Sequence, residues 1–385
     1  MSKRNANGEG SIYQRKDGRW CAAITVGYNP NGSQKKKYIY GKERNEVFQK
    51  LIELQNDIVI NGGYVRDDTI TLSQWSEKYL KEFVKNTVRA GTYDSYDVIL
   101  RNHINNSELA TMKLKDIKAY HLQAYINSKS HMSKSYIKKI HLLLNMFFDG
   151  AVKNDLIKKN PVLAINIPRS EKDTKEIEIL SREEQSAYMG AIGDSSFKPL
   201  LITALFTGMR LGELIALKWD NVNLTSNEIK VSASARETRI DGEWKLIRQA
   251  PKTKSGIRTI PIPATLSNYL KALKHKQENM QIEHDSYNKD NHVFCSTTGS
   301  VLNPRNVQRA HYKVCDNAKI NRVGFHALRH TFATRMIEEG VDVKTVQYWM
   351  GHATIQMTYN IYVHVQEQTK KAAATVQDNL LKSFI

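Results

Sequence analysis

Two breaks in the chain constrain its fold more than any other feature of the sequence. Asn61-Gly62-Gly63 ends one helical pattern, and the stretch from Pro161 to Lys175 joins two prolines to a charged run. Glycine, proline and polar clusters mark loops between regular elements. The 385 residues therefore divide into three regions, which we place at residues 1–65, 66–168 and 175–385. Two or three domains are expected for a chain of this length.

The first region has the pattern of a small sheet with one helix. Asp17-Gly18 is a strong hairpin signal, and it separates short strands expected at residues 11–15 and 20–28. A third strand is expected at residues 35–40. Apolar residues at helical spacing then follow at residues 43–60.

The turns of this predicted sheet are basic. A two-stranded ribbon fits the major groove of DNA, so we expect a DNA-binding sheet. The alternative is a generic sheet-and-helix module with a solvated basic face. The expected DNA contacts are Arg15, Lys16, Arg19, Lys35, Lys36 and Lys37.

The second region has the pattern of an all-helical domain. A capping box at Thr71 opens the first helix, and the expected helices cover residues 72–85, 92–102, 115–130 and 133–154. The last helix has an apolar stripe on one side and basic residues on the other. Each of these charges taken alone suits a solvated surface, but alternating apolar and basic faces favour a helical clamp on DNA. Its expected DNA contacts are Lys134, Lys138 and Lys139.

Net charge and cysteine content indicate the class of partner and the compartment. The chain has 57 Lys and Arg against 39 Asp and Glu, a formal charge of +18, which indicates a polyanionic partner such as nucleic acid. Its three cysteines are widely spaced and form neither a disulfide framework nor a zinc pattern, so a reducing cytoplasm is expected. The sequence contains no apolar stretch long enough to cross a membrane.

The third region carries a set of residues suited to phosphodiester chemistry. His326 and Arg329 are three residues apart, which places them on one face of a helix, and His352 and Tyr362 follow. Arg210 lies between apolar helical flanks, where a cation is costly unless it meets an anion. Together they supply proton carriers, fixed cations and a hydroxyl nucleophile.

Other interpretations of these residues, without phosphodiester chemistry, stay open at this point. Arg210 has the spacing for a structural salt bridge with Glu213. His326 and His330 have metal-ligand spacing, but the zincin pattern needs a glutamate after the first histidine and an alanine stands there. Residues 340–352 also resemble part of a helix-turn-helix, which would suit a DNA-binding regulator without catalysis.

The motifs in combination resemble the tyrosine recombinase family, and in particular phage and conjugative-transposon integrases. The matching segments are Thr207 to Glu213, the turn from Pro251 to Gly256, His326 to His330, Gly351-His352 and Tyr362 to His364. The resemblance implies an α+β multidomain protein with an arm-binding domain at 1–65 and a helical core-binding domain at 66–168. It also implies a mainly helical catalytic domain with a small antiparallel sheet at 175–385.

The resemblance further implies roles for six residues. Arg210 and Arg329 would hold the non-bridging oxygens of the scissile phosphate, which suits a planar, bidentate guanidinium. His326 and His352 would hydrogen-bond the same phosphate or move protons.

Two residues would make and break the bonds. Lys252 would protonate the departing 5′ oxygen, although the match is ambiguous by two residues and Lys254 is the rival. Tyr362 would be the nucleophile, and the trailing Val-His favours it over Tyr359.

The resemblance implies a reaction through a 3′-phosphotyrosine, without metal, ATP or any other cofactor. Two rounds of strand exchange on two duplexes need four active sites. A homotetramer on the core and arm attachment sites of double-stranded DNA is therefore implied. An excisionase or a DNA-bending protein is a further candidate partner. A type IB-like topoisomerase would form the same intermediate, but the separate N-terminal domain argues against it, since relaxation needs no second binding site.

Overall fold

The computed structural model describes residues 10–28, 33–60, 69–172, 177–240, 243–251, 254–352, 354, 356, 359, 378 and 381–384. Its contacts divide the chain into two compact units, residues 1–174 and 175–385. Within the described residues, no helix is both long and apolar enough to cross a membrane.

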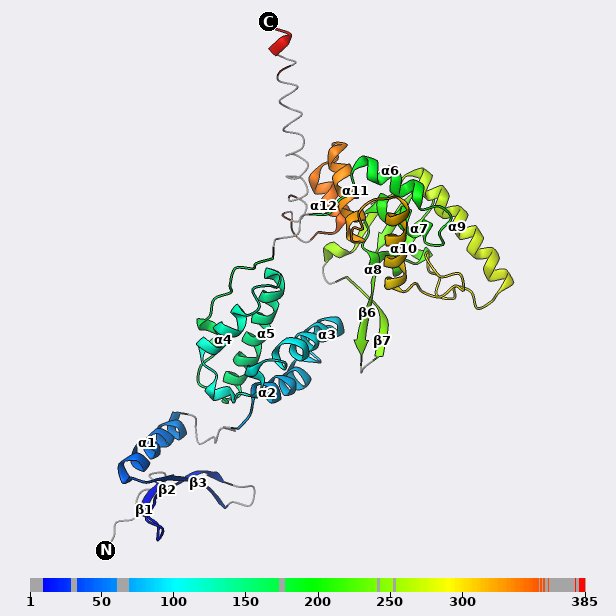
Figure 1. Ribbon diagram of the computed structural model, residues 1–385. Coiled ribbons are helices and arrows are strands. Elements are labelled where there is room, and N and C mark those ends of the chain that lie inside the picture. Colours follow the sequence, from blue (N-terminus) through cyan, green and yellow to red (C-terminus); the bar gives the residue numbers. More distant parts are fainter. Residues whose placement is uncertain are drawn as a thin grey trace. The chain divides into compact units, whose positions relative to one another are not determined.

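The N-terminal region is a three-stranded antiparallel sheet with a helix on one face, as predicted (Figure 1). Gly18 takes a φ of 80° in the first turn, a conformation that suits glycine. Ile24 and Val26 of the sheet pack with Val47 and Leu51 of the helix in a core of their own. The elements are β1 (Ser11–Gln14), β2 (Trp20–Tyr28), β3 (Gln34–Gly41) and α1 (Arg44–Ile60).

The second region is all-helical, and its core lies between its helices. The Trp75 indole Nε1 donates to the Phe147 carbonyl oxygen at 2.8 Å, which ties the first helix to the last. The predicted apolar stripe of residues 134–153 is buried. The elements are α2 (Leu72–Tyr79), the π-helical turn η1 (Leu80–Val84), α3 (Ala90–Ile99), the π-helical turn η2 (Leu100–Ile104), η3 (Glu108–Thr111), η4 (Leu114–Asp116), α4 (Ala119–Asn127), α5 (Lys134–Lys153) and η5 (Pro161–Ala164).

Several helix ends of this region differ from the sequence prediction. The helices expected at 72–85 and 92–102 pass into π-helical turns after residues 79 and 99. The helix expected from residue 115 begins at Ala119, after a short 3₁₀ turn. Apolar spacing finds the buried side of a segment, but it does not distinguish one type of helical turn from another at the ends.

The third region is mainly helical with small antiparallel sheets. Strands β4, β5 and β8 form one sheet and β6 pairs with β7. The helices are α6 (Arg182–Ala191), α7 (Lys198–Thr207), α8 (Leu211–Ile215), α9 (Ala264–Glu283), α10 (Pro304–Asn317), α11 (His326–Glu338) and α12 (Val343–Met350), with η6 (Trp219–Asn221) and η7 (Lys254–Gly256). The strands are β4 (Val222–Asn223), β5 (Glu228–Val231), β6 (Ser234–Ile240), β7 (Glu243–Gln249) and β8 (Arg258–Pro261).

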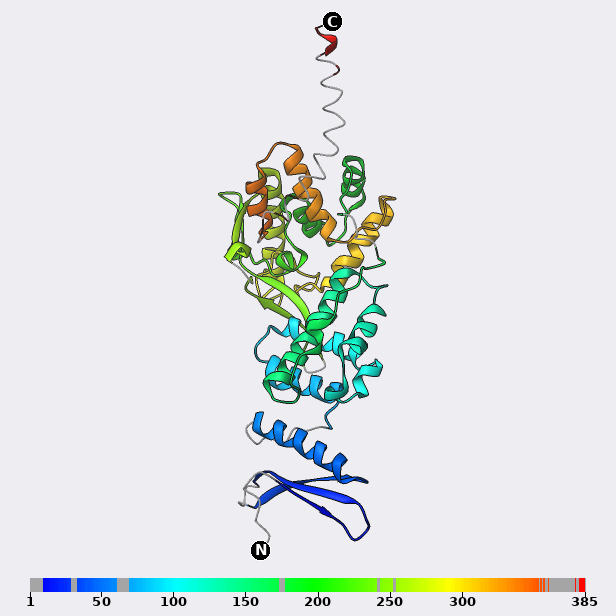
Figure 2. The ribbon, with the colours of Figure 1, turned by 90° about the vertical axis from the view of Figure 1, so that its left-hand side faces the viewer.

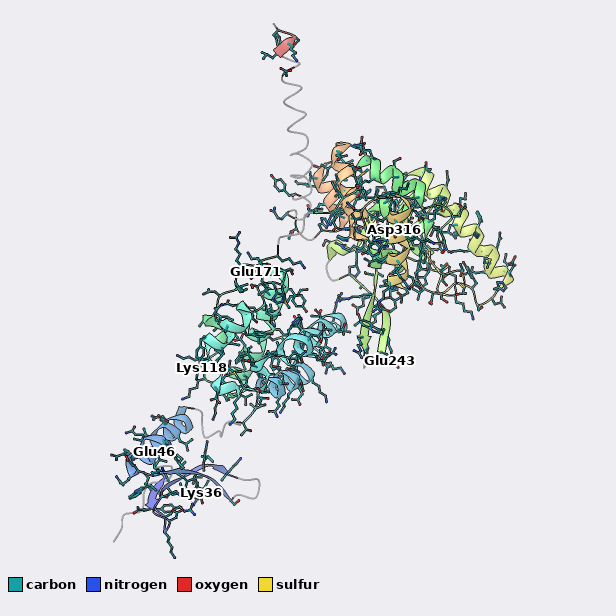
Figure 3. All side chains as sticks on the ribbon, viewed as in Figure 1. Lys36, Glu46, Lys118, Glu171, Glu243 and Asp316 are labelled. Atoms are coloured by element: carbon teal, nitrogen blue, oxygen red, sulfur yellow. The ribbon has the colours of Figure 1, made fainter. Side chains whose placement is uncertain are left out.

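The hairpin of β6 and β7 projects from the helices of this region in Figure 1, and Figure 2 shows the same ribbon turned by 90°. Glu243 is labelled at its end in Figure 3. The β6 segment reads SARETRI, and three of its seven residues are charged. Its two buried residues, Ala235 and Thr238, are three positions apart, so neither a period of two nor an apolar run marks it as a strand in the sequence.

Candidate active site

Two helices of the third region end in glycines that aim main-chain carbonyls at one place. Gly208 follows α7 with a φ of 62°, and Gly351 follows α12 with a φ of 58°. A Cβ on Gly208 would lie 2.5 Å from Phe332 Cδ1, so that glycine is required by both conformation and space. The left-handed turns free the last carbonyls of each helix to bind other groups.

Arg329 of α11 lies against these carbonyls and is 1% exposed. Its Nη1 donates to the Gly208 oxygen at 2.7 Å, and its Nη2 donates to the Met350 oxygen. Among the residues that the structure describes, its buried Nε has no partner and no carboxylate pairs with it. Burial and the nearby Arg210 lower the pKa of Arg329, but a guanidinium stays protonated in proteins. A buried cation held only by carbonyls is suited to receive an anion.

Arg210 caps the N-terminus of α8 and is partly exposed. Its Nη1 donates to Glu213 Oε1 at 2.8 Å, and its Nη2 donates to the Gly351 oxygen at 3.2 Å. The salt bridge considered from the sequence is therefore present. It leaves about a third of the Arg210 side chain, 36%, exposed to solvent and able to meet a ligand.

Glu213 also pairs with a second, fully buried arginine. Arg258 Nη2 lies 2.8 Å from Glu213 Oε2, and its side chain is 0% exposed. Burial alone would raise the pKa of Glu213, but the hydrogen bond and charge of Arg258, together with Arg210, lower that pKa to about 2. Two guanidinium groups thus bind one carboxylate and Arg329 lies nearby without pairing with it, so this arginine cluster (Arg210, Arg258, Arg329 and Glu213) keeps an excess of positive charge.

The predicted histidines lie beside the cluster. His326 begins α11 and keeps an exposed side, whereas His352 is 6% exposed and directly follows Gly351. Desolvation, followed by the cations and the other imidazole rings, lowers the pKa of His326 to about 4 and that of His352 to about 3. Both imidazoles are therefore neutral at pH 7, so each can donate one hydrogen bond and accept another.

The spacing of His326 and His330 left a metal site open, and the described residues do not add further ligands to this pair. His326 and His330 stack edge to face with their ring centroids 4.7 Å apart. Among the residues that the structure describes, no group of three or more His, Cys, Asp or Glu side chains is placed to hold a metal ion.

Two predicted catalytic residues, Lys252 and Tyr362, lie outside the described residues. The rival Lys254 begins the η7 turn, although its side chain is not described. The rival Tyr359 is described and is 48% exposed. Arg210, Arg329, His326 and His352 are brought together.

The predicted DNA-binding residues belong to the first two regions of the chain, and all of them except Lys37 are exposed. Lys134, Lys138 and Lys139 are exposed on one side of α5. Arg15 and Arg19 both pair with Asp17, at 3.9 and 2.8 Å, and Lys16 is exposed in the same turn. On β3, Lys35 and Lys36 are exposed and Lys37 is half-buried; Figure 3 labels Lys36.

Arg258 is not among the residues that the sequence predicted for the site. It shares a period of two with the apolar Ile260 and Ile262, so a strand places it on their buried face, and a buried cation needs a partner. That spacing is the signal from which Arg258 could have been found.

Comparison with known proteins agrees with this architecture. Residues 174–369 match the Phage integrase family, and residues 71–130 match the Phage integrase N-terminal SAM-like domain. The chain is 35% identical over 371 residues to the Tyrosine recombinase XerC-like of Caldanaerobacter subterraneus subsp. tengcongensis, a match that covers 92% of this chain and 95% of that protein.

Two solved structures share the fold at lower identity. The Tn1549 transposon integrase bound to transposon right end DNA has a TM-score of 0.63 and 21% identity, covering 79% of this chain and 100% of that one. A lambda integrase tetramer bound to a Holliday junction has a TM-score of 0.56 and 20% identity, covering 93% and 96%.

Proposed function

Because the chain belongs to the phage integrase family and is a site-specific tyrosine recombinase of mobile elements, we propose that its arginine cluster binds the scissile phosphate of DNA. The observation that carries this proposal is Arg329, a buried guanidinium with carbonyl partners, an unpaired Nε and no carboxylate among the described residues. A phosphodiester supplies the missing negative charge. Arg210, with its exposed edge, would take the second non-bridging oxygen.

We assign His326 and His352 to the same phosphate. Both rings are neutral in the free protein at pH 7, since their pKa values are lowered to about 4 and about 3. A bound phosphate brings negative charge close to them and raises both pKa values. Each ring can then donate to a phosphate oxygen, and either can accept the proton that the nucleophile loses.

Tyr362 is the proposed nucleophile and Lys252 the proposed general acid. The bond from the Tyr362 oxygen to phosphorus forms as the bond from phosphorus to the 5′ oxygen breaks. The phenol proton passes to a histidine or to water, and the Lys252 ammonium gives a proton to the departing 5′ oxygen. A 5′ hydroxyl of a partner duplex then attacks the phosphotyrosine and releases Tyr362. The phosphotyrosine ester keeps the energy of the broken DNA bond, so the reaction requires neither ATP nor metal.

The exposed cations are proposed to place DNA on the protein. Lys134, Lys138 and Lys139 would contact a core site, and the basic residues of β1 to β3 a separate arm site. Among solved structures of similar fold, lambda integrase is a dimer on a core site and a tetramer on a Holliday junction. We propose the same stoichiometry here, with an excisionase or DNA-bending protein as a further partner, in a bacterial cytoplasm.

The competing functions are weaker on specific grounds. A helix-turn-helix regulator would offer α12 to DNA bases, but the C-terminal end of α12 gives its Met350 carbonyl to Arg329. A topoisomerase would not need a second DNA-binding domain. The matched relative is a tyrosine recombinase over nearly its whole length.

Trapping on a suicide substrate tests the nucleophile. On a nicked duplex the cleaved strand diffuses away, so a covalent protein–DNA adduct accumulates. Tyr362→Phe should bind DNA normally and form no adduct, whereas the matched control Tyr359→Phe should form it. An adduct from Tyr362→Phe but none from Tyr359→Phe would reverse the assignment.

The same assay tests the proposal that cleavage needs no metal. Cleavage should persist in excess EDTA, and a loss that Mg²⁺ or Zn²⁺ restores would contradict metal-free chemistry.

Footprinting tests the arm-binding proposal. Removing residues 1–65 should leave cleavage of a core site intact but abolish protection of distal arm sequences. Identical footprints from both proteins would remove the arm-binding assignment.

A further inference from the structure

We propose that Arg258 is a positioning residue that orients Arg210 through Glu213 for binding of the scissile phosphate. The inference rests on the phosphate-binding role proposed above for Arg210, and it adds a residue outside the proposed catalytic set. Arg258 cannot itself touch DNA, because its side chain is 0% exposed. Any effect on the reaction must therefore pass through the groups that it binds.

Arg258 and Arg210 share the two oxygens of Glu213. Arg258 donates Nη2 to Oε2 at 2.8 Å and Nη1 to Oε1 at 3.1 Å. Arg210 donates its Nη1 to Oε1 at 2.8 Å and its main-chain N–H to Oε2 at 2.9 Å. Each carboxylate oxygen thus accepts one bond from each arginine, and the plane of the Glu213 carboxylate is fixed from both sides.

This sharing keeps part of the Arg210 guanidinium available. A carboxylate with one arginine partner prefers a bidentate pair, in which two parallel N–H groups of the guanidinium are used. Without Arg258, Glu213 could take such a pair with Arg210 and turn the guanidinium away from the phosphate. With Arg258 in place, a single Arg210 side-chain N–H is used by Glu213, and part of the Arg210 guanidinium stays exposed to solvent.

Arg258 also contacts the two other segments that carry proposed catalytic residues. Its Nε donates to the Trp349 oxygen near the end of α12, three residues before His352, and its Nη1 lies 3.4 Å from the Gly256 oxygen of the η7 turn. A Cβ on Gly351 would lie 3.0 Å from Arg258 Nη1, so the α12 terminus packs directly on this guanidinium. One buried side chain therefore links the Arg210 segment, the turn that follows Lys252 and the segment before His352.

The experiment compares three single variants of the full chain, and one double variant, on a nicked suicide duplex. Arg258→Lys keeps the charge but loses the bidentate fork. Arg335→Lys is the matched control, since Arg335 is also a largely buried arginine, paired at 2.8 Å with Glu338 in the same domain. Arg210→Lys tests the role on which the inference rests. DNA affinity, thermal unfolding and the single-turnover cleavage rate at saturating DNA are measured for each.

We expect Arg258→Lys to bind DNA normally and to cleave about 100-fold more slowly, the effect of a misplacement of about 1 Å. Arg335→Lys should lose thermal stability but cleave at the wild-type rate. The double variant Arg210→Lys/Arg258→Lys should be no slower than the slower single variant, because residues that act through one group are not additive. A purely structural role for Arg258 would give additive losses.

Each contrary outcome has a distinct meaning. Wild-type cleavage by Arg258→Lys, or additive losses in the double variant, overturns the positioning role while Arg210 keeps its own. Wild-type cleavage by Arg210→Lys overturns the proposed function of the site. If Arg258→Lys fails to fold, the pair Glu213→Gln/Arg258→Met removes both buried charges and leaves neither unpaired. That pair should fold and cleave slowly, and a wild-type rate from it overturns the proposal.

Discussion

The cations of the two compact units occupy opposite environments. In residues 1–174 the basic residues Lys138 and Lys139 stand exposed on α5, where salt screens their charge. In residues 175–385, Arg258 and Arg329 are buried and fixed by hydrogen bonds. Exposed cations give affinity that falls with salt, whereas fixed, desolvated cations act on charge that develops in the reaction. The difference predicts that substitutions in the two units change different measured quantities.

The largest effect is expected from a substitution in the arginine cluster, Arg210→Lys. Lysine keeps the charge but cannot bind Glu213, the Gly351 carbonyl and a phosphate with one planar group. Cleavage should slow by about 10²–10³-fold, the cost of losing one preorganised donor, with DNA affinity unchanged. Arg322→Lys, in an exposed pair with Asp316 at 2.7 Å, is the control and should cleave normally. Equal rates for both variants would remove the distinction between the two environments.

The second effect concerns the backbone that holds the buried cations. Gly208→Ala places a Cβ at a φ of 62° and 2.5 Å from Phe332 Cδ1. The left-handed strain and the crowding together should lower the unfolding free energy by about 2–3 kcal/mol. Gly190→Ala in α6, where a Cβ meets no atom within 4 Å, should be neutral or stabilising. Chemical denaturation measures both, and equal stabilities would show that the Gly208 turn tolerates a side chain.

A third effect follows from the burial of His352 beside the cationic Arg329 and Arg210. The pKa of His352 falls to about 3 in the folded protein, from about 6.5 in the unfolded chain. Between these values the unfolded state binds the extra proton, so the stability present above pH 6.5 is lost as the pH falls toward 3. The slope is about 1.4 kcal/mol per pH unit for this residue. Urea unfolding of His352→Gln should show a shallower slope than wild type between pH 6.5 and 5, and parallel curves would contradict the lowered pKa.

The smallest effect is expected on the exposed side. Lys138→Gln should reduce the slope of log affinity against log salt by about 0.9, which is the loss of one phosphate contact. The single-turnover cleavage rate at saturating DNA should not change. Lys153→Gln, near the other end of α5, is the comparison. A change in rate at saturation would mean that this lysine acts on the chemistry and not only on binding.

Much of this architecture follows from local patterns in the sequence. The sheet of residues 11–41 and the buried stripe of α5 obey simple periods, and the capping box at Thr71 forms as expected. The β6 strand could not be found because its buried residues, Ala235 and Thr238, do not follow a period of two. Its pairing with β7 depends on tertiary structure more than on local propensity.

The residues of the candidate site also differ in how far the sequence reveals them. Motif spacing identified Arg210, His326, Arg329 and His352, whose side chains lie together. It could not show that Arg258 pairs with Glu213, because the two residues are 45 positions apart in the sequence. Nor could it reveal that carbonyls at 208, 350 and 351 hold the guanidinium groups, because every residue has a carbonyl and only the fold selects which ones converge.

The carbonyl ligands of Arg210 and Arg329 have a consequence for how this site can change over generations. A side-chain ligand disappears with one point substitution, but a main-chain oxygen is encoded at every codon and survives any replacement that preserves the path of the backbone. Residues on the outer surfaces of α7 and α12 can therefore drift without removing a ligand. The vulnerable positions are Gly208 and Gly351, where a new side chain would redirect the chain itself. Selection on this half of the site acts on two glycines more than on the atoms that bind.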